Sequence, residues 1–341
     1  MTAISSEKSS SRGAKGTKDI RARVIYVILD NFVWVLVALL LIVARITTPS
    51  FFEPAILLNL LTQSSVLALL ALAETICLIS GYFDLSIESI LIFAAVFAAW
   101  LVVPHVAASG LEVAPILGIG LMLLAGALIG ALNGVLISYI KMNAFITTLA
   151  MSIVLIGSCV ALSHGNTLGP LPKAFVFFGE GKLGPVPVPI VVVFITYALF
   201  YLILRYFPFG RKLYAVGGNP DAASASGINV KKVVFIAYVL SGLISALAGL
   251  VLAGRMGAAV SHMTRNNLLY AFAAAVIGGV NPFGGQGRII SVFGGVILLT
   301  SINKLLVLAE VDPFLIAGAS GLIILIAMLV LTVKQKWVLE D

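Results

Sequence analysis

Long apolar runs separated by short polar segments dominate the pattern along this chain. Most of these runs contain 18 or more nearly uncharged residues, which is long enough to cross a hydrocarbon layer of about 30 Å as a helix. Ten such runs are found, at 26–44, 55–79, 86–103, 114–140, 144–162, 188–206, 233–253, 268–280, 289–308 and 313–333. The pattern predicts an all-α polytopic membrane protein with about ten transmembrane helices.

Two polar segments interrupt this pattern close to membrane depth. They are Ser80–Ser89 (SGYFDLSIES) and Gly278–Arg288 (GGVNPFGGQGR), and the run before the second is short for a full crossing. Irregular backbone at that depth requires protein or a water-filled cavity around it. Interrupted segments in both halves of a transporter indicate two internally related halves with a pathway between them. Two ordinary tight turns are the alternative, and the topology of 268–308 stays open.

A polar stretch rich in Gly and Ala, Gly210–Lys232, separates the sixth and seventh runs. Its middle predicts one short helix, in which Asn219 is the N-cap, Pro220 takes the first position and Asp221 lies at the positive end. Gly227 suits a left-handed stop. Only small side chains lie between these residues, so the helix buries little area of its own. We expect it to insert into a groove on a separate protein.

Glycines at intervals of four, Gly126, Gly130 and Gly134, share one face of the fourth run. Small residues on one face allow two helices to approach closely. Gly242, Ala246 and Gly249 repeat this arrangement in a later run. We interpret both sets as helix-packing surfaces.

Composition agrees with a membrane protein, since 61% of the residues are hydrophobic and only 10% are charged. The net charge of +7 does not indicate nucleic-acid binding, because the basic residues lie at span ends and in the N-terminal tail. Cys77 and Cys159 lie in apolar runs and indicate no disulfide framework. The three histidines show no ligand spacing, so we expect no metal site.

The basic residues also predict the orientation. With ten spans and both termini in the cytoplasm, fifteen of the 21 Lys and Arg residues are cytoplasmic, as the positive-inside rule requires. We expect a disordered basic cytoplasmic tail at 1–23, a permease domain at 24–336 with a cytoplasmic loop at 207–232, and a C-terminal tail at 337–341. The loop Ser163–Pro187 then faces outward.

Motifs for catalysis are missing from the sequence. It contains no GxxxxGK[ST] phosphate loop and no Ser/His/Asp or Cys/His constellation. Glu74, Asp84 and Glu88 stand out, because carboxylates inside a membrane are costly and often functional. Asp84 suits a cap for the helix that begins near Leu85–Ser86, and a pathway role is the alternative. A proton relay needs a titratable partner across spans, and the sequence suggests none.

Four segments together resemble one family. They are SGYFDLSIES, Asn133–Ser152 (NGVLISYIKMNAFITTLAMS), FGRKLYAVGGNPDAASASGINVKK and Ala271–Arg288 (AFAAAVIGGVNPFGGQGR). In this order and spacing they resemble the permease subunits of bacterial ABC importers for monosaccharides, of the ribose, galactose and xylose type. The resemblance extends from about Pro49 to Val333.

The resemblance implies a non-catalytic inner-membrane subunit of the ABC importer permease fold. The implied partners are a second permease copy or paralogue, a cytoplasmic ATPase that uses ATP and Mg, and a periplasmic sugar-binding protein; no cofactor is expected on this chain. The implied ATPase-coupling residues are Gly218, Asn219, Pro220, Asp221, Ala222, Ala223 and Gly227. The candidate residues of the translocation pathway are Asp84, Ser86, Asn133, Phe145, Thr147, Gly284 and Gly285.

The chain departs from the family pattern at several positions. Glu88 stands where the family usually has glycine, and Leu269–Tyr270 stand where it usually has Leu-Asp. Tyr82–Phe83 replace a Gly-Gly or Gly-Thr pair. These departures leave the sugar open, and they leave open whether the chain pairs with itself or with a different permease. The alternatives are a related ABC permease for branched-chain amino acids or nucleosides, an ion-coupled secondary transporter and a membrane enzyme.

Overall fold

The computed structural model describes residues 31–104, 109–264 and 266–312, together with residues 315, 318, 321, 322, 325 and 329. The expected tail at 1–23, the start of the first span, most of the span at 313–333 and the expected tail at 337–341 lie outside the described residues.

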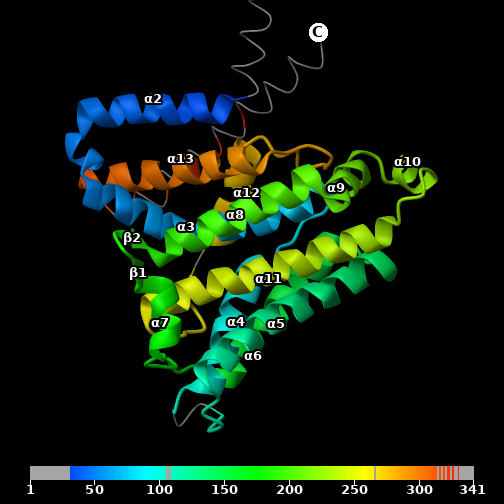
Figure 1. Cartoon of the computed structure of the whole chain (residues 1–341), viewed down its shortest axis with the longest axis horizontal. Coiled ribbons are helices and arrows are strands. Elements are labelled where there is room, and N and C mark those ends of the chain that lie inside the picture. The colour runs from blue at the N-terminus through cyan, green and yellow to red at the C-terminus, as the bar shows by residue number, and fades with distance from the viewer. Residues whose placement is uncertain are drawn as a thin grey trace, which may run out of the picture.

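The described chain is mostly helical and contains one two-stranded hairpin (Figure 1). Nine of its helices coincide with predicted spans, within a few residues at each end where those ends are described. These are α2 (Phe32–Thr47), α3 (Pro54–Ile79), α4 (Ile87–Val102), α5 (Pro115–Gly134, continued by the π-helical turn Val135–Tyr139), α6 (Ala144–Ser163), α8 (Val188–Tyr206), α11 (Val230–Met256), α12 (Asn267–Ile277) and α13 (Ile289–Leu308).

The expectation of about ten full crossings is not confirmed. Six of the described helices reach 18 residues with enough apolar character to cross a membrane, whereas α2, α4 and α12 have 16, 16 and 11 residues. At 1.5 Å per residue, α12 is about 16 Å long, which is roughly half of a hydrocarbon core. The segment 268–308 therefore consists of a half-length helix, an irregular turn and the full-length helix α13.

Six smaller elements lie between these helices. A 3₁₀ turn at Pro49–Phe52 precedes α3, and α7 (Lys173–Glu180) leads into a hairpin of β1 (Lys182–Leu183) and β2 (Val186–Pro187). The hairpin is antiparallel and pairs Lys182 with Pro187 and Leu183 with Val186. The last two are α9 (Pro208–Gly218) and α10 (Pro220–Ala225). In Figure 1, α9 and α10 lie at one end of the bundle and α7 with the hairpin at the other. We call these the α10 end and the α7 end.

The core lies around α3, α4 and α11. Every residue of α3 from Ser64 to Ile79 is buried, and α11 packs against α3, α4, α5 and α7. Proline occupies the first turn of α3, α5, α8, α9 and α10, where its missing N–H costs no hydrogen bond. Asparagine side chains cap α6, α10 and α11. These signals explain why the helix starts follow the sequence closely.

The predicted packing role of the glycines is confirmed. A Cβ added to Gly126 would lie 2.5 Å from the carbonyl oxygen of Gly242, and one added to Gly130 would overlap the carbonyl oxygen of Tyr238. Gly134 packs in the same way on Phe235. The helices α5 and α11 therefore touch through their backbones along this face.

Candidate functional site

The short helix α10 is built as its sequence predicts. Asn219 Oδ1 accepts a hydrogen bond of 2.9 Å from the backbone N–H of Ala222, Pro220 is the first helical residue, and Asp221 lies in the first turn. Gly227 has a φ of +81°, in the left-handed region that ends a helix. Ala223 is buried against the rest of the chain, whereas Ala222 is exposed. The helix therefore presents one face of small side chains to its surroundings.

A second helix in this stretch was missed. The sequence predicts one short helix between Gly210 and Lys232, but α9 already occupies Pro208–Gly218. Leu213 and Val216, three residues apart, are buried on its inner face, and its basic residues are exposed. Only Asn219 separates α9 from α10. The two helices thus follow one another directly at this end of the bundle, with the extended backbone of Asn219 between them.

Basic side chains surround this element. The exposed residues are Arg205, Arg211, Lys212, Lys231 and Lys232. The guanidinium of Arg205 lies 5.9 Å from the ring centre of Tyr201 and 5.8 Å from that of Tyr206. Tyrosine side chains together with basic residues at the end of an apolar helix are typical of the membrane–water interface. The α10 end therefore carries the charge pattern of a membrane boundary.

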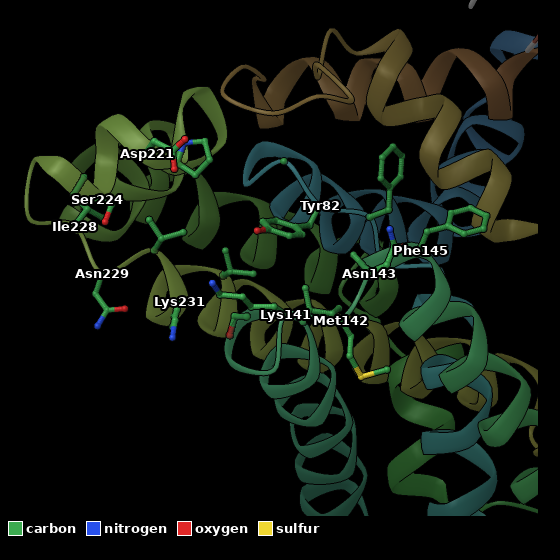
Figure 2. Close-up of a pocket in the computed structure, with 18 of the residues that line it drawn as sticks. Tyr82, Lys141, Met142, Asn143, Phe145, Asp221, Ser224, Ile228, Asn229 and Lys231 are labelled. Carbon is green, nitrogen blue, oxygen red and sulfur yellow. The ribbon is translucent and has the colours of Figure 1, made fainter.

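A cavity of about 950 Å³ opens between α10 and the turn that joins α5 to α6. Figure 2 shows Asp221 and Ser224 of α10 on one side, Lys141, Met142 and Asn143 of the turn on the other, and Tyr82 between them. Phe145, a candidate pathway residue, also lines this cavity and is 55% exposed. The cavity is therefore lined by α10, by the start of α6 and by the first interrupted segment.

The first interrupted segment, Ser80–Ser89, is held by a buried hydrogen-bond network. Asp84 Oδ1 accepts from Ser86 N at 3.0 Å and from Ser86 Oγ at 2.5 Å, and Asp84 Oδ2 accepts from Ser241 Oγ at 2.9 Å. Ser241 is the twelfth residue of α11, so at 1.5 Å per residue the segment reaches about 16 Å into the bundle from the α10 end. Asp84 thus organises the turn before α4 and joins it to α11.

The same network reaches two further helices. Asn133 of α5 donates to Ser86 Oγ at 2.9 Å, and Thr148 Oγ1 of α6 accepts from the backbone N–H of Leu85 at 3.1 Å. Asp84, Ser86 and Asn133, all predicted as pathway residues, are brought together and are fully buried. In this conformation they join α4, α5 and α11.

Glu74 lies next to this network, a proximity that the sequence did not suggest. Glu74 is 1% exposed, and its carboxyl group interacts electrostatically with that of Asp84. Glu74 Oε2 and Asn133 Oδ1 are buried and form no hydrogen bond with other described groups. Two carboxyl groups thus meet inside the bundle, one on α3 and one in the turn that follows it.

The remaining pathway candidates lie elsewhere. Thr147 is 3% exposed and donates to the backbone carbonyl of Asn143 at 2.7 Å, so its hydroxyl bonds within its own helix turn. Gly284 and Gly285, in the second interrupted segment, pack against α9 and have φ angles of +96° and +76°. The two interrupted segments therefore meet at the end of α9, whereas Phe145 and Thr147 lie at the start of α6.

Glu88 has a structural role that its sequence position does not reveal. Its carboxylate accepts hydrogen bonds from the backbone N–H groups of Asn267 (3.1 Å) and Leu268 (3.2 Å) and from Thr264 Oγ1 (3.1 Å). The residue before α12, Asn266, makes no side-chain cap and has a φ of +66°. Glu88 of α4 therefore caps α12 from a neighbouring helix.

Comparisons with known proteins agree over most of the chain. The family model described as "Branched-chain amino acid transport system / permease component" matches residues 56–333. The ribose import permease protein of Bacillus subtilis (strain 168) is 37% identical over 293 residues, which cover 85% of this chain and 89% of that protein. The L-arabinose transport system permease protein of Escherichia coli (strain K12) is 33% identical over 302 residues, covering 89% of this chain and 90% of that protein. The D-allose transport system permease protein of the same strain is 33% identical over 267 residues, covering 78% and 80%. No solved structure gives a significant match.

Proposed function

Because this chain belongs to the family of branched-chain amino acid transport system permease components, we propose that it is the membrane-spanning permease subunit of an ATP-binding-cassette importer. A periplasmic binding protein delivers the solute, and the pathway runs through this subunit and a second permease copy or paralogue. ATP is hydrolysed on a separate chain. The observation that carries the proposal is the capped α10 helix, with its exposed small-residue face, on a chain related to import permeases over 85% of its length.

The solute that we propose is a monosaccharide. The relatives named above carry the names of ribose, L-arabinose and D-allose permeases, and they align with most of this chain. The description of the family names branched-chain amino acids, which makes such an amino acid the second candidate. Uptake of labelled sugars and of labelled leucine by the same vesicles distinguishes the two.

We propose that the α10 end faces the cytoplasm and that α10 inserts into the ATPase. The five exposed basic residues around α9 and α10 support this orientation through the positive-inside rule. Gly218, Asn219, Pro220, Asp221 and Gly227 give α10 its shape, and Ala222 lies on its exposed face. Binding of the closed nucleotide cassettes then favours one of two arrangements of the bundle through differential contacts.

The roles of the other candidate residues follow from their surroundings. Phe145 lines the cavity beside α10, so we propose that it contacts solute near the cytoplasmic mouth of the pathway. Asp84, Ser86 and Asn133 are fully buried in this conformation, and in our proposal they reach solute only in the other arrangement of the bundle. In our proposal Gly284 and Gly285 move in the same rearrangement of the bundle, because they pack against α9.

The proposal is tested by a bulky residue on the exposed face of α10. Ala222→Trp is the choice, because Ala222 is exposed and Ala223 is buried, so that enlarging Ala223 would also disturb folding. The variant is expected to fold and reach the membrane, but to lose association with the ATPase and ATP-driven uptake. Ala222→Ser keeps the side chain small and serves as the matched control. Normal uptake by Ala222→Trp would refute the docking role of α10.

A further inference from the structure

The last two turns of α9 form a close junction with both interrupted segments. A Cβ placed on Gly217 would overlap the carbonyl oxygen of Ile79, the last residue of α3, and would lie 2.6 Å from the backbone nitrogen of Gly285. Gly217 therefore sits directly between the end of α3 and the second interrupted segment. A side chain of any size cannot enter this space without moving backbone.

The second interrupted segment is also hydrogen-bonded to the end of α3, directly before the first interrupted segment begins. The backbone N–H of Gly285 donates to the carbonyl oxygen of Ile79 at 2.9 Å. A Cβ on Gly284 would lie 2.7 Å from the carbonyl oxygen of Gly217 and 2.8 Å from the Cα of Gly81. Backbone from three parts of the chain thus meets at one place, which we call the glycine junction (Gly81, Gly217, Gly284 and Gly285).

Tyr214, one turn before Gly217, adds a side-chain hydrogen bond to this junction. Its hydroxyl donates to the carbonyl oxygen of Gly287 at 2.8 Å. Burial raises the pKa of Tyr214 above its ordinary value, and the nearby Arg288 partly offsets this effect. The phenol therefore stays protonated and remains a donor at neutral pH.

We propose that Gly217 and Tyr214 are positioning residues that transmit the movement of α10 to both interrupted segments at once. The inference rests on the proposed function, in which α10 binds an ATPase. Only Asn219 lies between α9 and α10, so a displacement of α10 carries the end of α9 with it. Close backbone contacts shift as discrete steps rather than deforming continuously, since such packing leaves no free volume.

Each segment leads from the junction to a different part of the bundle. The first passes through Asp84 to α4 and, through Ser241, to α11. The second is preceded by α12 and followed by α13. A displacement at the end of α9 therefore reaches α4, α11, α12 and α13 from a single point. The tightest glycine contact of α9, at Gly217, lies three residues before the start of α10.

The inference is tested with Gly217→Ala and Tyr214→Phe in the complex with the ATPase and the binding protein, reconstituted in proteoliposomes. The quantity measured is the amount of solute imported per ATP hydrolysed. We expect Gly217→Ala to lower this ratio about fivefold or more, at the lower end of ordinary coupling between sites. Tyr214→Phe, which removes one hydrogen bond, is expected to lower it about twofold. Both variants should still bind the ATPase, because the exposed face of α10 is unchanged.

A merely structural defect gives a different result. Partial misfolding lowers uptake and ATP hydrolysis together and leaves their ratio unchanged. Gly120→Ala is the matched control, because a Cβ at this helical glycine meets no atom within 4 Å. If Gly217→Ala does not fold, Tyr214→Phe decides, and an unchanged ratio in that variant overturns the inference. Failure of the wild-type chain to bind any ATPase would instead overturn the proposed function.

Discussion

Removing the carboxylate of Glu88 is expected to loosen α12 from the bundle. In the structure this carboxylate accepts two backbone hydrogen bonds at the start of α12 and a third from Thr264. The half-length helix has no cap from Asn266, the residue that precedes it. Glu88→Ala therefore leaves two backbone N–H groups of α12 and one hydroxyl without their acceptor.

The size of the effect follows from these three bonds. Loss of an N-terminal cap costs about 1 kcal/mol, and loss of a negative charge at the positive end of a helix costs about 0.3–1 kcal/mol more. A hydrogen bond between helices in a membrane contributes about 0.6 kcal/mol. The total destabilisation by Glu88→Ala is about 2–3 kcal/mol. Glu88→Gln keeps one acceptor oxygen but replaces the other with an NH₂ group that cannot accept, so it loses the charge and one backbone hydrogen bond, at a cost of about 1–1.5 kcal/mol.

Thermal unfolding of the purified protein in detergent measures this difference. At about 2 °C per kcal/mol for a chain of this size, Glu88→Ala should lower the Tm by about 4–6 °C and Glu88→Gln by about 2–3 °C. Glu180→Ala, which changes an exposed glutamate at the end of α7, is the control and should leave the Tm unchanged. If Glu88→Ala unfolds at the same temperature as Glu180→Ala, Glu88 does not stabilise α12.

Three further changes test other parts of the structure. Ser241→Ala removes one hydrogen bond to the buried carboxyl group of Asp84 and should lower the free energy of unfolding by about 1–2 kcal/mol. Thermal unfolding measures this difference, and an unchanged Tm would show that this hydrogen bond does not stabilise the protein. Asn219→Ala removes the N-cap of α10, which contributes about 1 kcal/mol to the stability of that helix. Co-purification with the ATPase should therefore fall while the Tm of the bundle stays constant, and undiminished co-purification would contradict this. Gly242→Ala forces α11 away from α5 at a cost of about 3 kcal/mol, so the amount of folded protein in the membrane should fall sharply. Gly120→Ala should accumulate normally, and equal amounts of the two variants would contradict the close crossing of α5 and α11.

The membrane-spanning helices could be predicted because each depends on a signal that is local in sequence. The run 233–253 corresponds to α11 at Val230–Met256, and Asn229 supplies the cap that fixes its start. The cap and stop of α10 were predicted for the same reason, since Asn219 and Gly227 act within one turn of their own positions. Residues close in sequence were therefore sufficient to predict the ends of these helices.

The short helices α7 and α9 were missed because their apolar faces are narrow. In α9 only Leu213, Val216 and the small Gly210 are buried, and the polar residues around them resemble a loop. The three-residue spacing of Leu213 and Val216 after Pro208 is the signal that could have revealed this helix. The helix α7, inside the predicted outward loop, buries only Phe175 and Gly179.

The contacts around Glu74 and Glu88 could not be predicted from local pattern. Glu88 is 176 residues from Thr264 in sequence, so their hydrogen bond depends on how α4 and α12 pack. The meeting of the two interrupted segments at Gly217 likewise joins residues far apart in the chain. Such contacts follow from the tertiary arrangement.

The most direct test of the account is solute uptake by proteoliposomes that contain this chain. With the partner ATPase, the binding protein and ATP, vesicles should import a labelled monosaccharide, and omission of the ATPase or of ATP should abolish import. A proton or sodium gradient across vesicles that contain the chain alone should drive no uptake. Ion-driven uptake by the chain alone would contradict the proposal that α10 couples this subunit to a separate ATPase.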